Sequence, residues 1–202
     1  VARKWRPWTE SNQRHTDFRN LAINVSPLFV AKSVNLPVPY DVTSVAEPDM
    51  SKLVECVPNF SEGRDAAVIR SIAAEIEAVR GVTLLDVDPG EDTHRTVITF
   101  VGPPEAVVEA AFRAGKRAAE TIDMTQHHGS HARMGAMDVC PFVPVAGVTM
   151  ADCVALAGEC GRRIGDLGIP VYLYEHAATS ASRSNLAAVR AGEYEGLASR
   201  LA

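Results

Sequence analysis

From about residue 50 onward, apolar residues follow in turn the two-residue spacing of strands and the three-and-four-residue spacing of helices. The apolar, β-branched segments predict strands at 52–57, 82–88, 96–102, 138–145 and 169–175. The helical spacing predicts helices at 64–80, from Pro103 and Pro104 onward and from Thr149 to about 168, with further helical turns over 184–202.

Several element ends carry recognisable signals. Gly81 is expected to end the first helix, and Thr149 with Asp152 forms a capping box that opens the third. The prolines inside 138–145 favour an edge strand or a bulged one. The element order predicts an α/β (α+β) fold: a ferredoxin-like βαββαβ mixed sheet with an added helix-strand unit and helices on the sheet surface.

The first 49 residues differ in composition from the remainder. They hold both tryptophans and five of the twelve prolines but none of the fourteen glycines, and Met50 is the first methionine. We expect residues 1–49 to be an appended N-terminal segment that is poorly ordered, and residues 50–202 to be the folded domain. The alternative is a natural N-terminal arm that packs Trp5 and Trp8 on the domain.

Charge and cysteine content exclude several classes of protein. The 20 basic and 25 acidic side chains give a formal charge of -5 without a basic block, so nucleic acid is not an expected partner. The four cysteines form no CxxC pair, which favours a reducing cytoplasm over a disulfide framework. The apolar run at 21–31 is too short to span a bilayer, so we expect neither a membrane segment nor an export signal.

Three of the six histidines lie in the connection before the strand at 138–145, at positions 127, 128 and 131. His131 could transfer protons or could cap a turn. A metal site is a third interpretation, because His127 and His131 are four residues apart. Gly129 weakens the helix that such a pair would need, and the spacing offers no third ligand.

A second polar cluster surrounds residues 86–95. Asp88 ends one strand and Arg95 begins the next, which is typical either of a ligand site or of a solvated hairpin. Asn59 and Ser61 precede a helix N-terminus, a place that suits an anion. No glycine-rich nucleotide motif is present, and the apolar surroundings of Cys56 and Cys140 predict inert core thiols.

Five segments resemble one known family over residues 50–202, whereas residues 1–49 match nothing in it. They are "VECVPNFSEGRD", "LLDVDPGEDTHRTVITFVG", "IDMTQHHGSHARMGAMDVCPFVPVAGVTM", "IPVYLYE" and "RAGEYEGL". Together they resemble the N-terminal subdomain of glutamate formiminotransferase. The resemblance implies transfer of a formimino group from N-formimino-L-glutamate to tetrahydrofolate, in histidine degradation and one-carbon metabolism. It also implies a homodimer, with tetrahydrofolate as co-substrate and no metal.

The resemblance also assigns residues to roles. The family's catalytic histidine lies in a Gly-x-His-Pro-Arg-Met-Gly-Ala motif, which maps onto 129–136 and makes His131 the catalytic residue, with Ala132 in place of the proline. We expect Asp88 to orient His131 or hold the amidinium, and Arg95 and Arg133 to pair with carboxylates of substrate or folate. Asn59 and Ser61 complete the expected substrate-binding and folate-binding set.

In the family a second subdomain follows the region that ends here at Ala202, and folate binds between the two halves. The chain is therefore expected to supply the half of the site with the catalytic histidine. Alternatives are a non-catalytic folate-binding or assembly fragment, a metal-dependent hydrolase built on the three histidines, and an enzyme whose second subdomain is a separate chain.

Overall fold

A computed structural model describes residues 23–26 and 51–201. Its strands are β1 (Ile23–Ser26), β2 (Leu53–Cys56), β3 (Asn59–Phe60), β4 (Thr83–Gly90), β5 (Arg95–Gly102), β6 (Met137–Ala146) and β7 (Val171–Leu173). Its α-helices are α1 (Ala66–Glu77), α2 (Pro104–Thr121), α3 (Met150–Gly165), α4 (Leu186–Arg190) and α5 (Leu197–Leu201). Two 3-10 turns, η2 (Glu175–Ala177) and η3 (Ala181–Arg183), join β7 to α4.

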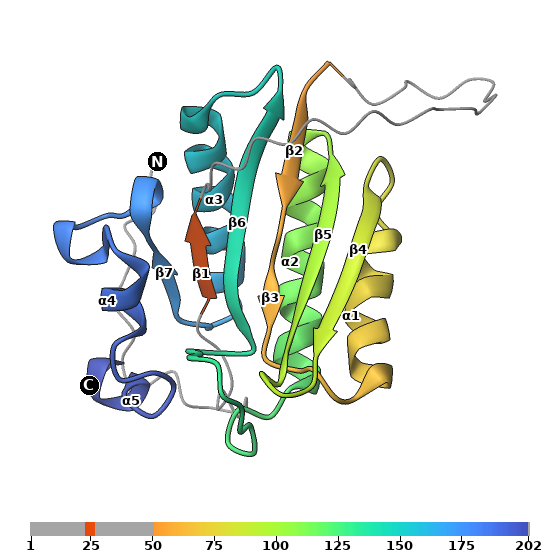
Figure 1. The fold of residues 1–202 in the computed structure, drawn as a ribbon. Helices are drawn as coiled ribbons and strands as arrows, with labels where there is room; N and C mark the ends of the chain where they lie inside the picture. The colour runs from red at the N-terminus through yellow and green to blue at the C-terminus, as the bar shows by residue number, and fades with distance from the viewer. Residues whose placement is uncertain (1–22, 27–50, 202) are drawn as a thin grey trace.

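All of these strands form one mixed sheet (Figure 1). β2 and β3 both lie between β5 and β6 and pair antiparallel with each, so together they act as one interrupted strand. β4 pairs with the outer side of β5, and β1 lies parallel between β6 and β7. β1 belongs to residues 1–49, which we predicted to be an appended and poorly ordered segment. The other residues of that segment lie outside the described part of the chain.

The three long helices α1, α2 and α3 lie behind the sheet in Figure 1, while α4 and α5 pack on its other face at β6, where Val139 shares an apolar cluster with Val189 and Leu197. Alternation along β5 matches this arrangement. Ile98 and Phe100 are completely buried, whereas Val97, Thr99 and Val101 are only half-buried. Burying each large side chain of this kind stabilises the fold by about 1.5–3 kcal/mol, so the face covered by α1, α2 and α3 carries the main core.

Two of the helix starts follow local rules. The Asp65 carboxylate accepts the amides of Ala67 and Val68 at 2.7 and 3.2 Å and so begins α1. The predicted capping box of α3 is confirmed, since the Thr149 hydroxyl accepts from the Asp152 amide while the Asp152 side chain accepts from the Thr149 amide. No helix in the part of the chain that the structure describes is both long enough and apolar enough to cross a membrane.

The predicted strands and helices of residues 50–202 are confirmed, with three corrections. β6 is an inner strand and not an edge, because β3 and β1 flank it; the bulge prediction holds, since the pairing register shifts opposite β2 and β3. The expected turn at Asn59 and Phe60 is a short strand, and the first helix ends before Gly81, at Glu77. The mixed α/β class with its antiparallel pairs and surface helices is observed, and the ferredoxin-like topology stays a prediction.

Candidate active site

Three connections meet at one end of the sheet. They are the segment from β3 to α1, the turn from β4 to β5, and the loop before β6. Their backbones touch, because a Cβ added to Gly63 would lie 2.3 Å from the Gly90 carbonyl oxygen and one added to Gly129 would lie 2.3 Å from that of Thr93. Glycine is therefore required at both close approaches, and the loop that carries the histidines rests directly on the β4–β5 turn.

His131 is half-buried in this loop and both of its ring nitrogens have partners. Its Nε2 lies 2.5 Å from Nη1 of Arg95, and its Nδ1 lies 2.6 Å from the Ala132 carbonyl oxygen. A guanidinium can only donate and a carbonyl can only accept. His131 is therefore the neutral tautomer with its proton on Nδ1, and the lone pair of Nε2 faces Arg95.

Arg95 begins β5 and is half-buried. Its Nε is buried and finds no partner among the described residues. Burial lowers the pKa of the Arg95 guanidinium, an effect that the charge of Asp138 opposes and that of Arg190 reinforces. Because an arginine starts from so high a pKa, Arg95 remains a cation beside His131.

A buried ion pair lies next to these two residues. Asp138 is 1% exposed; one of its oxygens pairs with Nη2 of Arg190, and the other accepts the Met134 amide at 2.8 Å. Arg190 is the last residue of α4, and its side chain is 18% exposed. The neighbourhood of His131 thus holds the guanidinium groups of Arg95 and Arg190 and the carboxylates of Asp138 and Glu193. Because Asp138 pairs with Arg190, Arg95 is the cation that best suits an anionic ligand.

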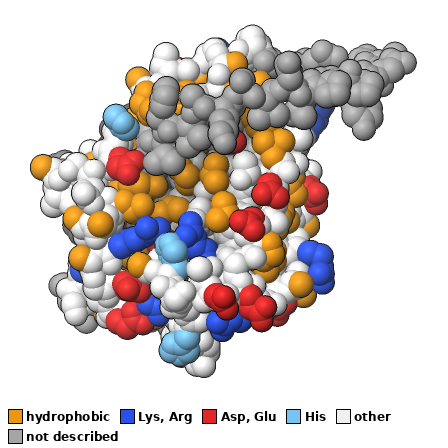
Figure 2. Space-filling view, viewed as in Figure 1, with side chains coloured by type: hydrophobic (Ala, Val, Ile, Leu, Met, Phe, Trp, Pro, Cys, Tyr) orange, Lys and Arg blue, Asp and Glu red, His pale blue; other side chains and the backbone are white. Residues whose placement is uncertain are grey.

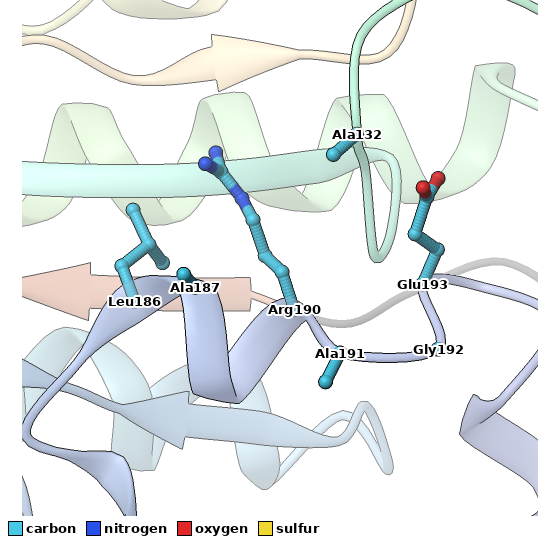
Figure 3. A pocket seen from close by; sticks show the side chains of 7 residues that line it. All are labelled: Ala132, Leu186, Ala187, Arg190, Ala191, Gly192 and Glu193. Carbon is cyan, nitrogen blue, oxygen red and sulfur yellow. The ribbon is translucent and has the colours of Figure 1, made fainter.

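A pocket of about 480 Å³ opens at this place, between the loop before β6 and α4 (Figure 3). Ala132 contributes to one side, and Leu186, Arg190 and Glu193 contribute to the other. Its size lies within the range of ordinary small-molecule sites. Figure 2 shows a histidine side chain between basic side chains on the same face of the molecule, below an apolar stretch of the open sheet.

Arg133 was predicted to bind a carboxylate of a ligand, and the structure places it against carboxylates of the protein. Its guanidinium pairs with Glu193 at 2.9 Å and with Glu195 at 2.7 Å. The hydrogen bond to Glu195 raises the pKa of Arg133 against the effect of burial, and Glu193 adds to it. Arg133 therefore fastens the C-terminal segment to the loop, and Arg190 takes the place beside the pocket.

Asn59 and Ser61, predicted near an anion site, are both buried and tie the backbone together. The Ser61 hydroxyl donates to the Gly135 carbonyl at 2.7 Å, and the Asn59 amide donates to Val57 O at 2.8 Å. The N-terminus of α1 is occupied by the carboxylates of Glu62 and Asp65, so the anion there belongs to the protein.

Asp88 is exposed on β4. It lies opposite Val97 in the register, while Gly90 lies opposite Arg95, so Asp88 and Arg95 share the open face of the sheet. Among the described residues no hydrogen bond or ion pair joins Asp88 to His131, and its proposed orienting role is without a contact here.

The other two histidines of the cluster differ from each other. His127 is 3% exposed; its Nε2 lies 2.8 Å from the His94 carbonyl oxygen, and its Nδ1 accepts from Nε of Arg133 at 3.2 Å. His128 is exposed. Within residues 23–26 and 51–201, no three His, Cys, Asp or Glu side chains are arranged to hold a metal ion.

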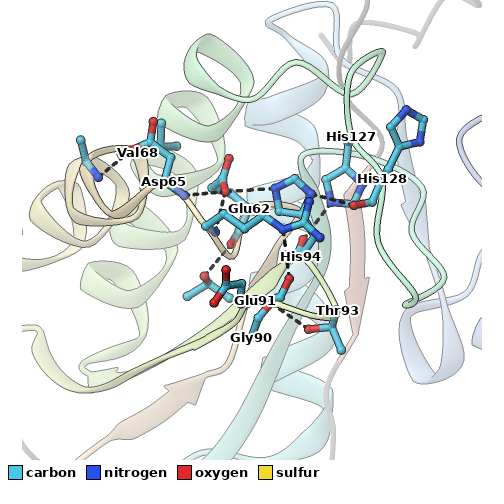
Figure 4. Close-up of polar contacts among 12 residues, drawn as sticks. Glu62, Asp65, Val68, Gly90, Glu91, Thr93, His94, His127 and His128 are labelled. Carbon is cyan, nitrogen blue, oxygen red and sulfur yellow. Dashed lines mark hydrogen bonds and ion pairs between the residues drawn. The ribbon is translucent and has the colours of Figure 1, made fainter.

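The sequence did not single out two residues that the structure places beside the candidate site. Arg190 stands at a helix C-terminus directly before Ala191 and Gly192, inside the segment "RAGEYEGL" that carries part of the family resemblance. His94 stacks on His127, with ring centroids 4.3 Å apart and planes at 8° (Figure 4). In the sequence, His94 is distinguished only by its position next to Arg95, in a turn rich in polar residues.

The predicted core thiols Cys56 and Cys140 are completely buried, with their sulfur atoms 3.6 Å apart. Burial raises the pKa of the Cys56 thiol, so this residue stays protonated and is a poor nucleophile, as expected.

Comparison with known proteins identifies a family. Residues 53–202 match the family described as "Formiminotransferase domain, N-terminal subdomain". The chain is 57% identical over 153 residues to a formimidoyltransferase-cyclodeaminase of Dictyostelium discoideum, a match that covers 75% of this chain and 28% of that protein. It is 50% identical over 153 residues to a glutamate formimidoyltransferase of Streptococcus pyogenes, covering 75% of this chain and 51% of the relative. A glutamate formimidoyltransferase of Thermoplasma acidophilum is 52% identical over 139 residues, covering 68% of the chain and 46% of the relative.

Proposed function

The chain belongs to the family of formiminotransferase N-terminal subdomains, and from this premise we propose that it supplies one wall of a site for formimino transfer. The donor is N-formimino-L-glutamate and the acceptor is tetrahydrofolate, which is a co-substrate. The chain spans about half the length of the two glutamate formimidoyltransferases that it matches, so the other wall comes from a second subdomain or a second chain. We place the reaction in histidine degradation, in the cytoplasm and in a homodimer.

The reaction needs one proton to leave a nitrogen and one to reach another. N5 of tetrahydrofolate attacks the formimino carbon, and the carbon–nitrogen bond to glutamate then breaks. N5 loses a proton during the attack, and the departing glutamate nitrogen gains one. An imidazole can perform both transfers in turn because its ordinary pKa lies near neutrality.

The contact between His131 and Arg95 is the single observation that carries the proposal. Nε2 of His131 holds a lone pair, as a base must, and the next residue, Ala132, lines the pocket. The same contact provides a cation for an anionic substrate. A substrate carboxylate is a better partner for Arg95 than a neutral imidazole nitrogen is. Binding of the substrate therefore draws the guanidinium from Nε2 and frees the base.

The remaining charges divide the substrate-binding roles. Arg190, which lines the pocket, joins Arg95 in holding carboxylates of the donor or of the folate glutamate. Asp88, on the same sheet face as Arg95, is the carboxylate that can hold the cationic formimino group. Arg133, Asn59 and Ser61 support the loop through their contacts within the protein.

The test measures turnover and binding separately. His131→Ala should lower kcat by about 10²- to 10⁴-fold, with little change in melting temperature. Turnover is followed as release of glutamate, using this chain together with a polypeptide that covers the remainder of a glutamate formimidoyltransferase. His128→Ala is the matched control, because this neighbouring histidine is exposed and its substitution should leave kcat unchanged.

A second candidate function is a non-catalytic folate-binding fragment, which the partial coverage of the relatives favours. Titration calorimetry of the chain with folinic acid distinguishes this candidate from an enzyme when it is compared with the turnover assay. Binding without turnover in the presence of the second half would support that candidate. An unaltered kcat in His131→Ala would remove His131 from the mechanism.

A further inference from the structure

His94 joins two segments that carry the candidate catalytic pair. It stands one residue before Arg95 in the β4–β5 turn, and its Nδ1 lies 3.0 Å from the carbonyl oxygen of His128, three residues before His131. Its Nε2 lies 3.1 Å from Oε1 of Glu62, in the segment before α1. Figure 4 shows the ring between these partners. One side chain therefore connects all three segments at this end of the sheet.

The partners of His94 determine its charge. The His128 carbonyl can only accept, so Nδ1 of His94 carries a proton. Glu62 already accepts the amides of Arg64 and Asp65 at 2.8 and 2.9 Å. Although partial burial opposes the change, these amides and His94 lower the pKa of Glu62. Glu62 is therefore an ionised acceptor, so Nε2 of His94 also carries a proton and the ring is an imidazolium.

His127 has the opposite state. Its Nε2 donates to the His94 carbonyl, and its Nδ1 accepts from Arg133, so the ring is neutral. Burial lowers the pKa of His127, in part offset by the His94 carbonyl, and the charges of His94 and Arg133 lower it further. A cationic ring thus stacks on a neutral one at 4.3 Å, an arrangement that adds attraction to the two hydrogen bonds of His94.

The backbone segments on the two sides of this contact are packed closely together. A Cβ added to Gly129 would lie 2.9 Å from Cβ of His94 as well as against the Thr93 carbonyl. His94 itself has a φ of 50°, in the left-handed region that few residues other than glycine adopt. A conformation of this kind persists where the surrounding contacts determine it, and the hydrogen bonds of the His94 ring are among these contacts.

We propose that His94 is positively charged in the native protein and acts as a positioning residue, clamping the loop of residues 127–131 onto the β4–β5 turn and so holding His131 against Arg95. The consequence for catalysis rests on the proposed function. The charge of His94 and the order of the loop do not, since they follow from Glu62, the His128 carbonyl and the close approach at Gly129.

The clamp depends on pH through Glu62. It needs this carboxylate in its ionised form, and because the pKa of Glu62 is lowered, the clamp is lost only on strong acidification. The charged groups that face the stacked rings are Glu62 from the segment before α1 and Arg133 from the loop itself, and Arg133 is in turn paired with carboxylates of the C-terminal segment.

The test is nitrogen-15 NMR of the histidine rings in this 202-residue chain. At neutral pH we expect His94 with two ring N–H groups, His127 with its proton on Nε2 and His131 with its proton on Nδ1. A neutral His94 alongside an ordered loop would overturn the proposal. Because this spectrum concerns the unaltered chain, it decides the question even if a variant fails to fold.

Two variants of His94 and one control test the positioning role. His94→Asn can keep a donor near the His128 carbonyl and His94→Gln can keep one near Glu62, but neither carries the charge. In both, amide exchange over residues 127–131 should rise about tenfold, and His131 should show a mixture of tautomers. His128→Gln, which keeps its backbone carbonyl, should leave both signals as they are.

Protection of the β2 and β6 amides serves as the measure of an intact fold in each variant. If the His131 tautomer is unchanged in both His94 variants while the fold is intact, His94 does not position it. None of these measurements involves formimino transfer, so an inactive assembly would contradict the proposed function and leave this result standing.

Discussion

Replacing Asp138 by asparagine should destabilise the protein, although the two side chains have nearly the same size. Asp138 is 1% exposed, accepts the Met134 amide at one oxygen and pairs with Arg190 at the other. Asparagine can keep the acceptor for Met134, but it presents an NH2 group or a neutral oxygen to a guanidinium. The buried Nε of Arg190 already has no partner among the described residues, so the guanidinium has little with which to replace the lost charge.

The loss of stability in Asp138→Asn depends on how well water can solvate the Arg190 guanidinium once its carboxylate partner is gone. Removing one partner of a fully buried ion pair costs about 3–5 kcal/mol because an uncompensated charge is left behind. The Arg190 side chain is 18% exposed, so water recovers part of this, and we expect a loss of about 2–3 kcal/mol in the free energy of unfolding. In a chain of this size about 1 kcal/mol shifts Tm by roughly 2–4 °C, so Tm should fall by about 5–10 °C.

Calorimetry and urea unfolding of Asp138→Asn, Arg190→Met and the double variant measure this directly. If the ion pair is the cause, the two single costs should exceed the cost of the double variant by at least about 1 kcal/mol, because the second substitution removes the stranded partner. A Tm for Asp138→Asn within about 1 °C of the parent, or strictly additive costs, would refute the reasoning.

Two further predictions concern the same end of the sheet. Arg95→Lys should raise KM for N-formimino-L-glutamate more than it lowers kcat, because lysine keeps the charge but loses the planar fork; steady-state kinetics in the active assembly decide it, and an unchanged KM for both substrates would end the carboxylate role. Gly129→Ala should lower Tm, because its Cβ would lie 2.3 Å from the Thr93 carbonyl. Gly158→Ala in α3, where a Cβ meets nothing within 4 Å, should instead stabilise the protein by about 0.5–1 kcal/mol, and thermal melts in which both variants move in the same direction would contradict the packing argument.

The sequence predicted those elements that are determined by residues close together in the chain. The capping box of Thr149 and Asp152 and the alternation along β5 depend on neighbours within one element, and both are found where expected. β3 is different, because Asn59 and Phe60 form a strand only by pairing with β5 on one side and β6 on the other. The inner position of β6 likewise depends on long-range pairing. Its prolines suggested an edge or a bulge, and the register shifts opposite β2 and β3 show that the strand is bulged and lies inside the sheet.

The candidate site divides in the same way. The sequence motif pointed to His131 and the loop cluster pointed to Arg95, and the structure brings the two together at 2.5 Å. The partners of the other two arginines could not be predicted from the sequence. Arg190 meets Asp138 across 52 residues of sequence, and Arg133 meets Glu195 across 62, so the partner that each guanidinium finds is a property of the folded chain.

Ala132 shows why the loop needs such long-range partners. The family motif has proline at this position, which would fix φ and reduce the freedom of the unfolded loop, and alanine forgoes a stabilisation of about 0.4–1 kcal/mol. In this chain the order of the loop comes from side chains on either side of Ala132. Arg133 binds two glutamates of the C-terminal segment, and His94 holds the His128 carbonyl. These contacts hold the loop on both sides of Ala132, so we expect His131 to keep one tautomer without the proline.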